Sequence, residues 1–310
     1  MIKFTLRQLH YFTAVARTGH YGRAAEACAV TQPALSVQVQ ELEAQLGVVL
    51  FERGRKGVML TADGRAIAER AAKILASAQD LADHARHANK PLTGVLHFGM
   101  IPTVAPYLLP PLLPMLKRSF PDLELHVRET QTAILLAELA DAKLDVALVA
   151  LPVADPDLEC SALIKDRFML AVPRDFKTKG RVVVDAALLR QERLLLLEEG
   201  HCFRDQALSY CALQQSSALN TLGASSFATI VRMVANGHGI TLLPEMAVST
   251  EVRGKEVRLL RIRDPEPTRT LGLAWRKSSP RKRDFEALGR LLQASKSESR
   301  GSQLLAGRGR

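Results

Sequence analysis

The sequence predicts a protein of two folded units, a small helical one at the N-terminus and a larger α/β one after it, joined by a long helix. Three observations predict this. Short apolar segments recur at helical spacing up to residue 60, an Ala-rich amphipathic pattern fills residues 61–88, and strand-like and helix-like segments alternate from residue 91. A chain of 310 residues with 47% hydrophobic and 24% charged residues is long and apolar enough to form such units.

The net charge of +10 is concentrated at the two ends of the chain. Residues 1–60 carry seven Lys/Arg and four Asp/Glu, residues 276–310 carry ten and three, and the stretch between them is neutral. Such an excess indicates a polyanionic partner. Residues 297–310 are rich in Gly, Ser and Arg, so we expect a basic disordered tail there.

The composition also limits where the protein works and what it binds. No stretch reaches the roughly 20 consecutive apolar residues of a membrane span, and the N-terminus lacks the pattern of a signal peptide. We therefore expect a cytoplasmic protein with no membrane partner. Its four cysteines include no CxxC and no Cys/His cluster with zinc spacing, so we expect no disulfide framework, no metal and no cofactor.

Residues 1–60 predict a helix-turn-helix followed by a wing. A first helix covers residues 5–17, and two further helical segments, YGRAAEACAV and QPALSVQVQELEAQLG, flank a turn at Val30-Thr31. Pro33 near the start of the last helix and Gly47 after its end are the usual boundary residues. Two short helices joined by a tight turn are typical of DNA-binding modules.

The second of these helices has two distinct faces at 100° per residue. One face is expected to be buried and consists of Leu35, Val39, Leu42 and Leu46. The other carries small or hydrogen-bonding side chains, which a helix needs in order to reach base edges in the major groove. A basic turn and a short apolar strand follow, as in a winged helix-turn-helix. An ordinary surface helix is the alternative. The predicted DNA-binding residues are Gln32, Pro33, Ser36, Val37, Gln40, Arg53 and Arg55.

Residues 61–88 predict one long helix between the two units. Thr61 is expected to cap its N-terminus, with Asp63 in the first turn. An apolar stripe along a helix of this kind is suited to dimerisation, and a dimer would match an operator with two half-sites. The predicted stripe consists of Ile67, Ala71, Ile74, Ala78 and Leu81.

From residue 91 the alternation of segments predicts a parallel α/β sheet. Ligands bind open α/β sheets outside the carboxyl ends of the strands. Thr103 follows the first strand, Thr132 begins the helix after another, and His201-Cys202 follow a later one, so these residues could meet at one cleft. The predicted strands are VLHFGMI, LELHVRE, LDVALVAL, RLLLLEEG and RTLGLAWR, with one more between the two helices of SSFATIVRMVANGHGITLLPEMAV, and the last predicted helix is FEALGRLLQAS.

Cys202 has the surroundings of a reactive thiol. It lies near the N-terminus of an expected helix, FRDQALSYCAL, with Arg204 two residues further on and Asp205 placed to pair with that arginine. The thiolate is the nucleophilic form of cysteine, and positive potential favours it. A buried, inert thiol is the alternative.

The nine-residue interval between Cys202 and Cys211 constrains what the pair can do. A disulfide requires Cα atoms roughly 4.4–6.8 Å apart, whereas one continuous helix would separate them by about 13 Å, on opposite faces. A bond between them therefore requires the segment to refold. Oxidation that selects a second local conformation is what a redox switch needs.

The segments LRQLHYFTAVARTGHYGRAAEACAVTQPALSVQVQELEAQLGVVLFER and LTADG resemble the DNA-binding domain of LysR-type transcriptional regulators, and the resemblance covers roughly residues 4–295. It implies an α/β chain with an all-α-type winged helix-turn-helix domain, a linker helix and a two-lobed effector domain like a periplasmic binding protein. The implied bounds are 1–60, 61–90 and 91–296, with lobe I at 91–166 plus 270–296 and lobe II at 167–269.

The stretch LEEGHCFRDQALSYC resembles the sensing loop of the hydrogen-peroxide-responsive members of this family, in its GHCxRDQA core and its nine-residue interval. The resemblance implies that peroxide oxidises Cys202 to a sulfenic acid and that Cys211 resolves it to a redox-active disulfide. Phe203 departs from the pattern, because it is bulkier than the leucine expected there. GMIPTVAPYLLP, RETQTAILLAELADAKLD and RTLGLAWR also resemble pocket segments, so the implied peroxide pocket is Thr103, Thr132, His201, Arg204, Asp205 and Arg269.

The resemblance further implies a non-enzymatic activator of oxidative-stress genes. Its partners would be double-stranded promoter DNA, hydrogen peroxide, further copies of itself in a dimer or homotetramer, RNA polymerase, and a thiol reductant such as glutaredoxin or thioredoxin. One alternative is a LysR-type regulator that binds a small organic effector in the inter-lobe cleft. Another is a thiol enzyme such as a peroxidase, against which the DNA-binding unit and the missing CxxC count.

Overall fold

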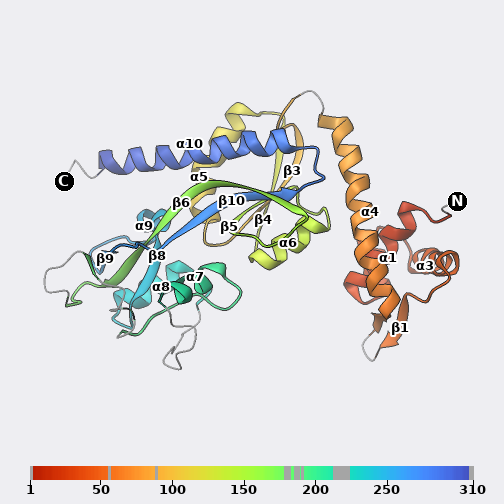
Figure 1. Ribbon diagram of the computed structural model, residues 1–310, viewed down its shortest axis with the longest axis horizontal. Helices are drawn as coiled ribbons and strands as arrows, with labels where there is room; N and C mark the ends of the chain where they lie inside the picture. The colour runs from red at the N-terminus through yellow and green to blue at the C-terminus, as the bar shows by residue number, and fades with distance from the viewer. Residues whose placement is uncertain are drawn as a thin grey trace. The chain divides into compact units, whose positions relative to one another are not determined.

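The computed structural model describes residues 3–54, 57–87, 90–177, 183–184, 189, 192–211 and 224–306. The chain forms two compact units, one that contains residues 1–88 and one that contains most of the chain from residue 89 onward. Figure 1 labels their helices and strands, and each unit is described by itself.

The N-terminal unit is helical with one two-stranded hairpin. Thr5 caps its first helix in a capping box with Gln8, and Gly19 ends that helix with a φ of 62°. These caps confirm the predicted first helix and its break. The elements are α1 (Leu6–Thr18), α2 (Tyr21–Ala27), α3 (Gln32–Leu46), β1 (Phe51–Gly54), β2 (Gly57–Leu60) and α4 (Ala62–His87).

The predicted faces of α3 and the predicted start of α4 agree with the structure. Three residues of the expected stripe of α3, Leu35, Val39 and Leu42, are fully buried, and Leu46 is half-buried. Thr61 Oγ1 accepts a hydrogen bond of 2.9 Å from the backbone N–H of Gly64, which caps α4.

The C-terminal unit contains one eight-stranded sheet in the order β4-β3-β5-β10-β6-β9-β7, with β8 also paired to β6. Strands β3, β4 and β5 are parallel, whereas β10 runs antiparallel to β5 and β6, and β6 runs antiparallel to β8 and β9. The sheet is therefore mixed, and the predicted parallel arrangement holds only for part of it. Its strands are β3 (Gly94–Met100), β4 (Leu123–Glu129), β5 (Val146–Leu151), β6 (Leu158–Pro173), β7 (Val183–Val184), β8 (Thr241–Pro244), β9 (Val257–Ile262) and β10 (Thr268–Arg276).

Two hydrophobic cores lie along this sheet, and the long strand β6, which pairs with β10, contributes side chains to both (Figure 1). The first core gathers Phe98, Leu148 and Phe285, and the second gathers Phe168 and Leu242, each with further aliphatic side chains. The helices that cover the sheet are α5 (Ala105–Ser119), α6 (Thr132–Ala140), α7 (Cys202–Cys211), α8 (Phe227–Ala235), α9 (Glu245–Glu251) and α10 (Lys282–Ala306).

Two segments differ from the prediction. Among the described residues, RLLLLEEG forms single-residue parallel bridges rather than a strand, at Leu194 with Ile240 and at Leu197 with Ala224. Helix α10 continues to Ala306, so residues 297–306 are helical where a disordered tail is predicted. Extending an existing helix costs much less than starting one. Residues 307–310 lie outside the described residues.

Within the described part of the chain, every helix is too short or too polar to cross a membrane.

Candidate functional site

A buried arginine ties together three elements of the C-terminal unit. Arg269 of β10 is 3% exposed. Its Nε donates to Asp166 Oδ2 of β6 at 3.0 Å, its Nη1 to Thr103 Oγ1 at 2.8 Å, and its Nη2 to Thr103 O at 3.0 Å. Asp166 Oδ1 also accepts from the backbone N–H of Met246 at 3.3 Å. The charge-assisted bonds fix the loop after β3 against the two long strands.

These bonds also determine the role of the Thr103 hydroxyl. A guanidinium has five N–H donors and no acceptor, so Thr103 Oγ1 must accept from Arg269. The hydroxyl proton then points away from the arginine. Buried Thr103 therefore offers a hydrogen-bond donor to a small molecule that binds beside it.

Cys202 is the first residue of α7, half-buried and packed against the first core. The chain enters α7 through Gly200, whose φ is 89°. This left-handed φ favours glycine, and the glycine leaves room for the end of the Gln131 side chain, since a Cβ there would lie 2.5 Å from Gln131 Oε1. Gln131 Nε2 donates to Glu199 O at 3.3 Å. The start of α7 therefore lies against the start of α6, whose first residue is Thr132.

Two polar atoms on these helices are buried and form no hydrogen bond to any described protein atom. They are Thr132 Oγ1 and Gln206 Oε1. Buried polar atoms almost always have a hydrogen-bond partner in the protein or in an ordered water molecule. The sequence reasoning missed Gln206. Its position four residues after Cys202, on the same face of α7, is the signal that would have found it.

His201 lies immediately before α7 and is 9% exposed. Burial lowers the pKa of its imidazole, and the nearby Glu198 opposes part of that effect. The neutral ring is therefore the favoured form at neutral pH. A neutral imidazole has one donor and one acceptor nitrogen, which suits a neutral polar ligand.

The expected pairing of Arg204 with Asp205 does not occur. Arg204 Nη1 donates to the backbone oxygen of Leu197 at 3.1 Å. Asp205 is exposed in the first turn of α7. The two side chains do not meet because neighbouring residues of a helix point in different directions. Arg204 instead anchors α7 to the segment that leads into it.

Phe203, the neighbour of Cys202, lies in the second core and is 1% exposed. Its ring centroid lies 4.8 Å from that of Phe168 and 5.0 Å from that of Phe227. The guanidinium carbon of Arg269 lies 5.4 Å from the same ring centroid, a cation–π contact. The residue beside Cys202 therefore contacts the arginine that holds Thr103.

Cys202 and Cys211 are the first and last residues of α7. This confirms the predicted helix. Nine rises of 1.5 Å separate their Cα atoms by about 13 Å, beyond the roughly 4.4–6.8 Å of a disulfide. Cys202 is a free thiol, and the side chain of Cys211 lies outside the described part. A bond between the two requires α7 to unwind.

The two cysteines outside this helix have raised pKa values. Burial raises the pKa of the Cys28 thiol, which packs against a core of the N-terminal unit. Burial, Asp155 and Glu159 raise the pKa of Cys160. A raised pKa leaves less thiolate at neutral pH, so these two thiols are weak nucleophiles.

The predicted DNA-binding residues of α3 lie on its outward side. Gln32, Pro33 and Gln40 are exposed, Val37 is 50% exposed, and Ser36 is half-buried. The wing is present as the antiparallel pair β1–β2, in which Phe51 pairs with Leu60 and Arg53 with Val58. The side chain of Arg53 and all of Arg55 lie outside the described residues.

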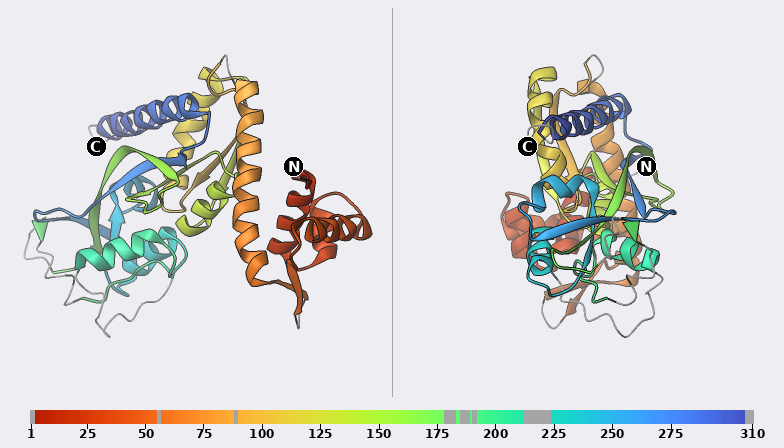
Figure 2. Two further views of the ribbon diagram at one scale, coloured as in Figure 1. Left: turned by 45° about the vertical axis from the view of Figure 1, so that its right-hand side comes forward. Right: turned by 90° about the vertical axis from the view of Figure 1, so that its left-hand side faces the viewer.

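The predicted apolar stripe of α4 divides into two parts. Ala71 is buried, and Ile67 packs beside it against the core of the N-terminal unit. Farther along the helix Ala78 is half-buried, Ile74 is 43% exposed and Leu81 is 73% exposed. Figure 2 shows α4 as one straight helix. Among the described side chains, Ile74 and Leu81 therefore expose apolar surface beyond the core of this unit.

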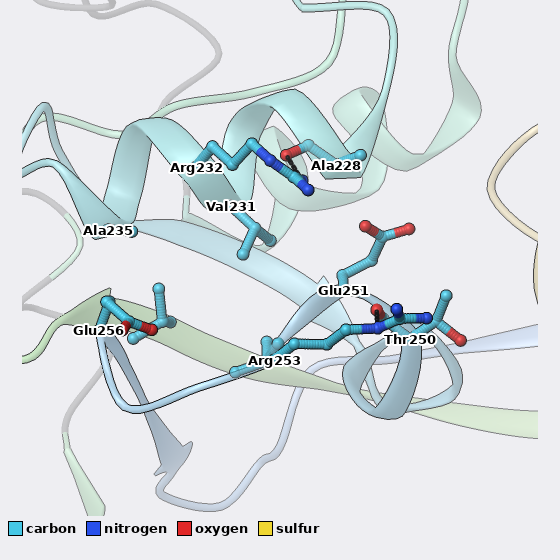
Figure 3. Close-up of a pocket in the computed structure, with 10 residues that line it drawn as sticks. Ala228, Val231, Arg232, Ala235, Thr250, Glu251, Arg253 and Glu256 are labelled. Carbon is cyan, nitrogen blue, oxygen red and sulfur yellow. Dashed lines mark hydrogen bonds between the residues drawn. The ribbon is translucent and has the colours of Figure 1, made fainter.

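A cavity of about 400 Å³ lies between α8, α9 and β9 (Figure 3). Arg232 Nη1 donates to Ala228 O and Arg253 Nε donates to Thr250 O, so both arginines bind carbonyls of their own segments. None of the predicted pocket residues lines this cavity. Among the described residues, no three His, Cys, Asp or Glu side chains are placed to hold one metal ion.

Comparison with known proteins gives the family. Residues 6–65 match the model of the bacterial regulatory helix-turn-helix protein of the lysR family, and residues 89–297 match the LysR substrate binding domain. The chain belongs to the LysR family. Its relatives are transcriptional regulators, so this LysR-family chain is a DNA-binding regulator and not an enzyme. The predicted winged helix-turn-helix and α/β domains are confirmed with it.

Three similar proteins share the name OxyR. The DNA-binding transcriptional dual regulator OxyR of Escherichia coli K12 is 40% identical over 289 residues, 93% of this chain and 95% of that protein. A full-length OxyR variant from Pseudomonas aeruginosa superimposes with a TM-score of 0.76 at 38% identity, covering 94% of this chain and 98% of that one. An OxyR mutant from Corynebacterium glutamicum, described as H2O2-bound, gives 0.68 at 35% identity, with 98% and 96% covered.

Proposed function

We propose that this LysR-family regulator is a cytoplasmic transcription factor that senses hydrogen peroxide at Cys202 and reports it through the segment from Cys202 to Cys211. Relatives at 40% identity bear the name hydrogen peroxide-inducible genes activator. One observation carries the proposal: a single helix begins with a half-buried thiol, ends with a second cysteine, and carries Gln206 Oε1, a buried atom without a hydrogen-bond partner among the described residues.

The peroxide site that we propose is built from the starts of α6 and α7 and the loop after β3. Thr103 supplies a hydroxyl donor, because its oxygen already accepts from Arg269. Thr132 Oγ1 and Gln206 Oε1 are buried atoms without a hydrogen-bond partner in the described part of the chain, and His201 is a buried, neutral donor and acceptor. Together these groups match a molecule with two donor hydrogens and two acceptor oxygens. Arg204 and Asp205 would not contact the peroxide in this site; Arg204 helps to position α7 by its bond to Leu197.

In the first step the Cys202 thiolate attacks one peroxide oxygen. The S–O bond forms as the O–O bond breaks, and the second oxygen leaves as hydroxide, which takes up a proton to become water. Cys202 becomes a sulfenic acid and the peroxide is reduced. The leaving oxygen gains negative charge, and a hydroxyl polarised by Arg269, such as that of Thr103, is suited to stabilise it.

In the second step the sulfur of Cys211 attacks the sulfur of the Cys202 sulfenic acid. The S–S bond forms, the S–O bond breaks, and the hydroxyl leaves as water with the proton from the Cys211 thiol. The helical distance of about 13 Å must close first, so α7 unwinds before the bond can form. A thiol reductant such as glutaredoxin or thioredoxin would return both cysteines to thiols.

The change in α7 would then alter DNA binding. We propose lobe I at 91–166 plus 270–296 and lobe II at 167–269, since β6 contributes its first half to one hydrophobic core and its second half to the other. The exposed apolar side chains of α4, Ile74 and Leu81, support assembly into a dimer or tetramer. Repacking of the effector domains would change the spacing of the α3 helices on the operator and the contact with RNA polymerase.

A quantified map of thiols in reduced and peroxide-treated protein tests the proposal. We expect one equivalent of peroxide to convert Cys202 and Cys211 into a single disulfide while Cys28 and Cys160 remain reduced. Calorimetry with small organic metabolites tests the alternative of an effector ligand. An unchanged thiol map together with metabolite binding would replace peroxide sensing by that alternative.

A further inference from the structure

When α7 unwinds from its start, Cys202 and Phe203 move together. Consecutive Cα atoms are 3.8 Å apart across a trans peptide, so a displacement of Cys202 by several ångströms carries its neighbour with it. Phe203 is the most deeply buried side chain of the first turn of α7. Unwinding α7 from its start therefore means withdrawing this ring from the second core.

The contacts of the ring come from three separate elements. Phe168 lies in β6, Phe227 begins α8, and Arg269 lies in β10. Arg269 cannot follow the ring outward, because Asp166 and Thr103 hold its guanidinium. The cation–π contact and both ring–ring contacts are lost together when the ring leaves.

We propose that Phe203 is a positioning residue that sets the rate of the second step. The inference rests on the proposed function. The ring holds the start of α7 in its helical form, so Cys202 is oxidised to the sulfenic acid while α7 is still a helix. The disulfide then forms only as fast as the ring leaves the contacts with Phe168, Phe227 and Arg269. The first step does not require this movement, so Phe203 leaves it unchanged.

The variant Phe203→Leu tests this, because leucine keeps an apolar side chain at the site but has no ring. Rapid mixing of the reduced full-length protein with hydrogen peroxide, followed by acid quench and mass spectrometry, gives the rates of both steps. We expect disulfide formation about tenfold faster than in the unaltered chain, the order expected from losing ring–ring and cation–π contacts. The rate of sulfenic acid formation should change less than twofold.

Two further variants separate the role of Phe203 from a general loss of core packing. Phe285→Leu removes a buried ring from the first core, where its centroid lies 5.4 Å from that of the tilted Trp275 ring, and should change neither rate. Phe227→Leu leaves α7 untouched but removes one partner of the Phe203 ring, and should accelerate the second step by a smaller factor. A second step that is unchanged in Phe203→Leu, or equally changed in Phe285→Leu, overturns the proposal.

Amide hydrogen exchange of α7 in the reduced protein tests the role of Phe203 without peroxide, and so independently of the proposed function. We expect the amides of α7 to exchange about tenfold faster in Phe203→Leu than in Phe285→Leu. If the unaltered chain forms no disulfide but exchange rises in this way, the function proposed above is wrong and the role of Phe203 in holding α7 stands. Equal exchange in the two variants overturns that role as well.

Discussion

Arg269 and Thr103 form two hydrogen bonds, from Nη1 to the Thr103 hydroxyl at 2.8 Å and from Nη2 to the Thr103 carbonyl at 3.0 Å. The same guanidinium binds Asp166 at 3.0 Å, and both charged side chains are almost fully buried. One cation thus orients a threonine hydroxyl and neutralises a carboxylate that has no access to water. Stability and the proposed chemistry therefore depend on the same side chain.

Replacing Arg269 with leucine should destabilise the C-terminal unit by roughly 3–5 kcal/mol, since it leaves the Asp166 carboxylate buried without its partner. Denaturant unfolding measures this. Adding Asp166→Asn to Arg269→Leu removes the unpaired buried charge and should recover at least about half of the lost stability. The double variant should still react slowly with peroxide, because the Thr103 hydroxyl is no longer oriented. Full peroxide reactivity in the double variant would contradict the role given to Thr103.

Thr132→Val should separate stability from function. The Thr132 hydroxyl is buried and forms no hydrogen bond to a described protein atom. Valine has nearly the same shape without the polar atom, so the free energy of unfolding should stay the same or rise by about 1 kcal/mol. Oxidation of Cys202 should nevertheless slow by roughly tenfold, the effect of losing one hydrogen bond to the ligand. A purely structural Thr132 would give the opposite pattern, a loss of stability with an unchanged oxidation rate.

Serine variants of the two helix-end cysteines should stop the reaction at different stages. Cys202→Ser should abolish peroxide-dependent transcription while operator binding survives, because no thiolate remains at the start of α7. Cys211→Ser should still form a sulfenic acid at Cys202, which a dimedone label detects, but a peptide map should contain no disulfide. Cys160→Ser, at an exposed thiol on β6, is the matched control and should behave like the unaltered chain. Robust peroxide induction in Cys202→Ser would refute the assignment.

Local sequence patterns predicted the N-terminal unit well and the sheet of the C-terminal unit less well. Pro33 and Gly47 mark the ends of α3 because caps act over one turn of the chain. Strand β6 was not predicted, since Lys165, Asp166 and Arg167 in its middle look like surface residues. Asp166 is buried there only because Arg269 pairs with it from 103 positions away. A pattern read over a few neighbouring residues cannot show a pairing between residues so far apart in the sequence.

The same distinction applies to the site. The sequence singled out Cys202 and Cys211, and it singled out Thr103 and Thr132 largely through the family resemblance; their roles stay predictions. The partners of these residues were not singled out. Gln206 and the Phe168–Phe203–Phe227 contacts depend on which face of α7 meets the second core, and that orientation is set by long-range packing. The expected Arg204–Asp205 pair failed for a local reason, because Arg204 binds the carbonyl of Leu197 instead.

Gln40→Ala should weaken binding to the specific operator roughly tenfold, within the ~1–3 kcal/mol of a good contact between a side chain and a base. Gln40 is exposed on the outward side of α3, opposite the buried Leu35 and Leu42. Binding to unrelated DNA should change little, since phosphate contacts dominate it. Gln45→Ala removes an exposed glutamine near the end of the same helix and is the matched control. Fluorescence anisotropy at fixed salt, with operator and scrambled duplexes, separates base reading from a general electrostatic effect.

His201 should make the stability of the C-terminal unit depend on pH. Burial lowers the pKa of the His201 imidazole in the folded chain. In the unfolded chain the pKa of this histidine is about 6.5, so the folded chain binds the proton less tightly. The stabilisation from neutral His201 is therefore fully present above about pH 6.5 and is lost as the pH falls through the lower, folded pKa. Urea unfolding from pH 5 to pH 8 should show this decline, and His201→Gln should reduce its slope. His238→Gln, at an exposed histidine, is the control. If the free energy of unfolding depends on pH equally in His201→Gln and in the unaltered chain, another group titrates. His201 is then not held neutral by burial.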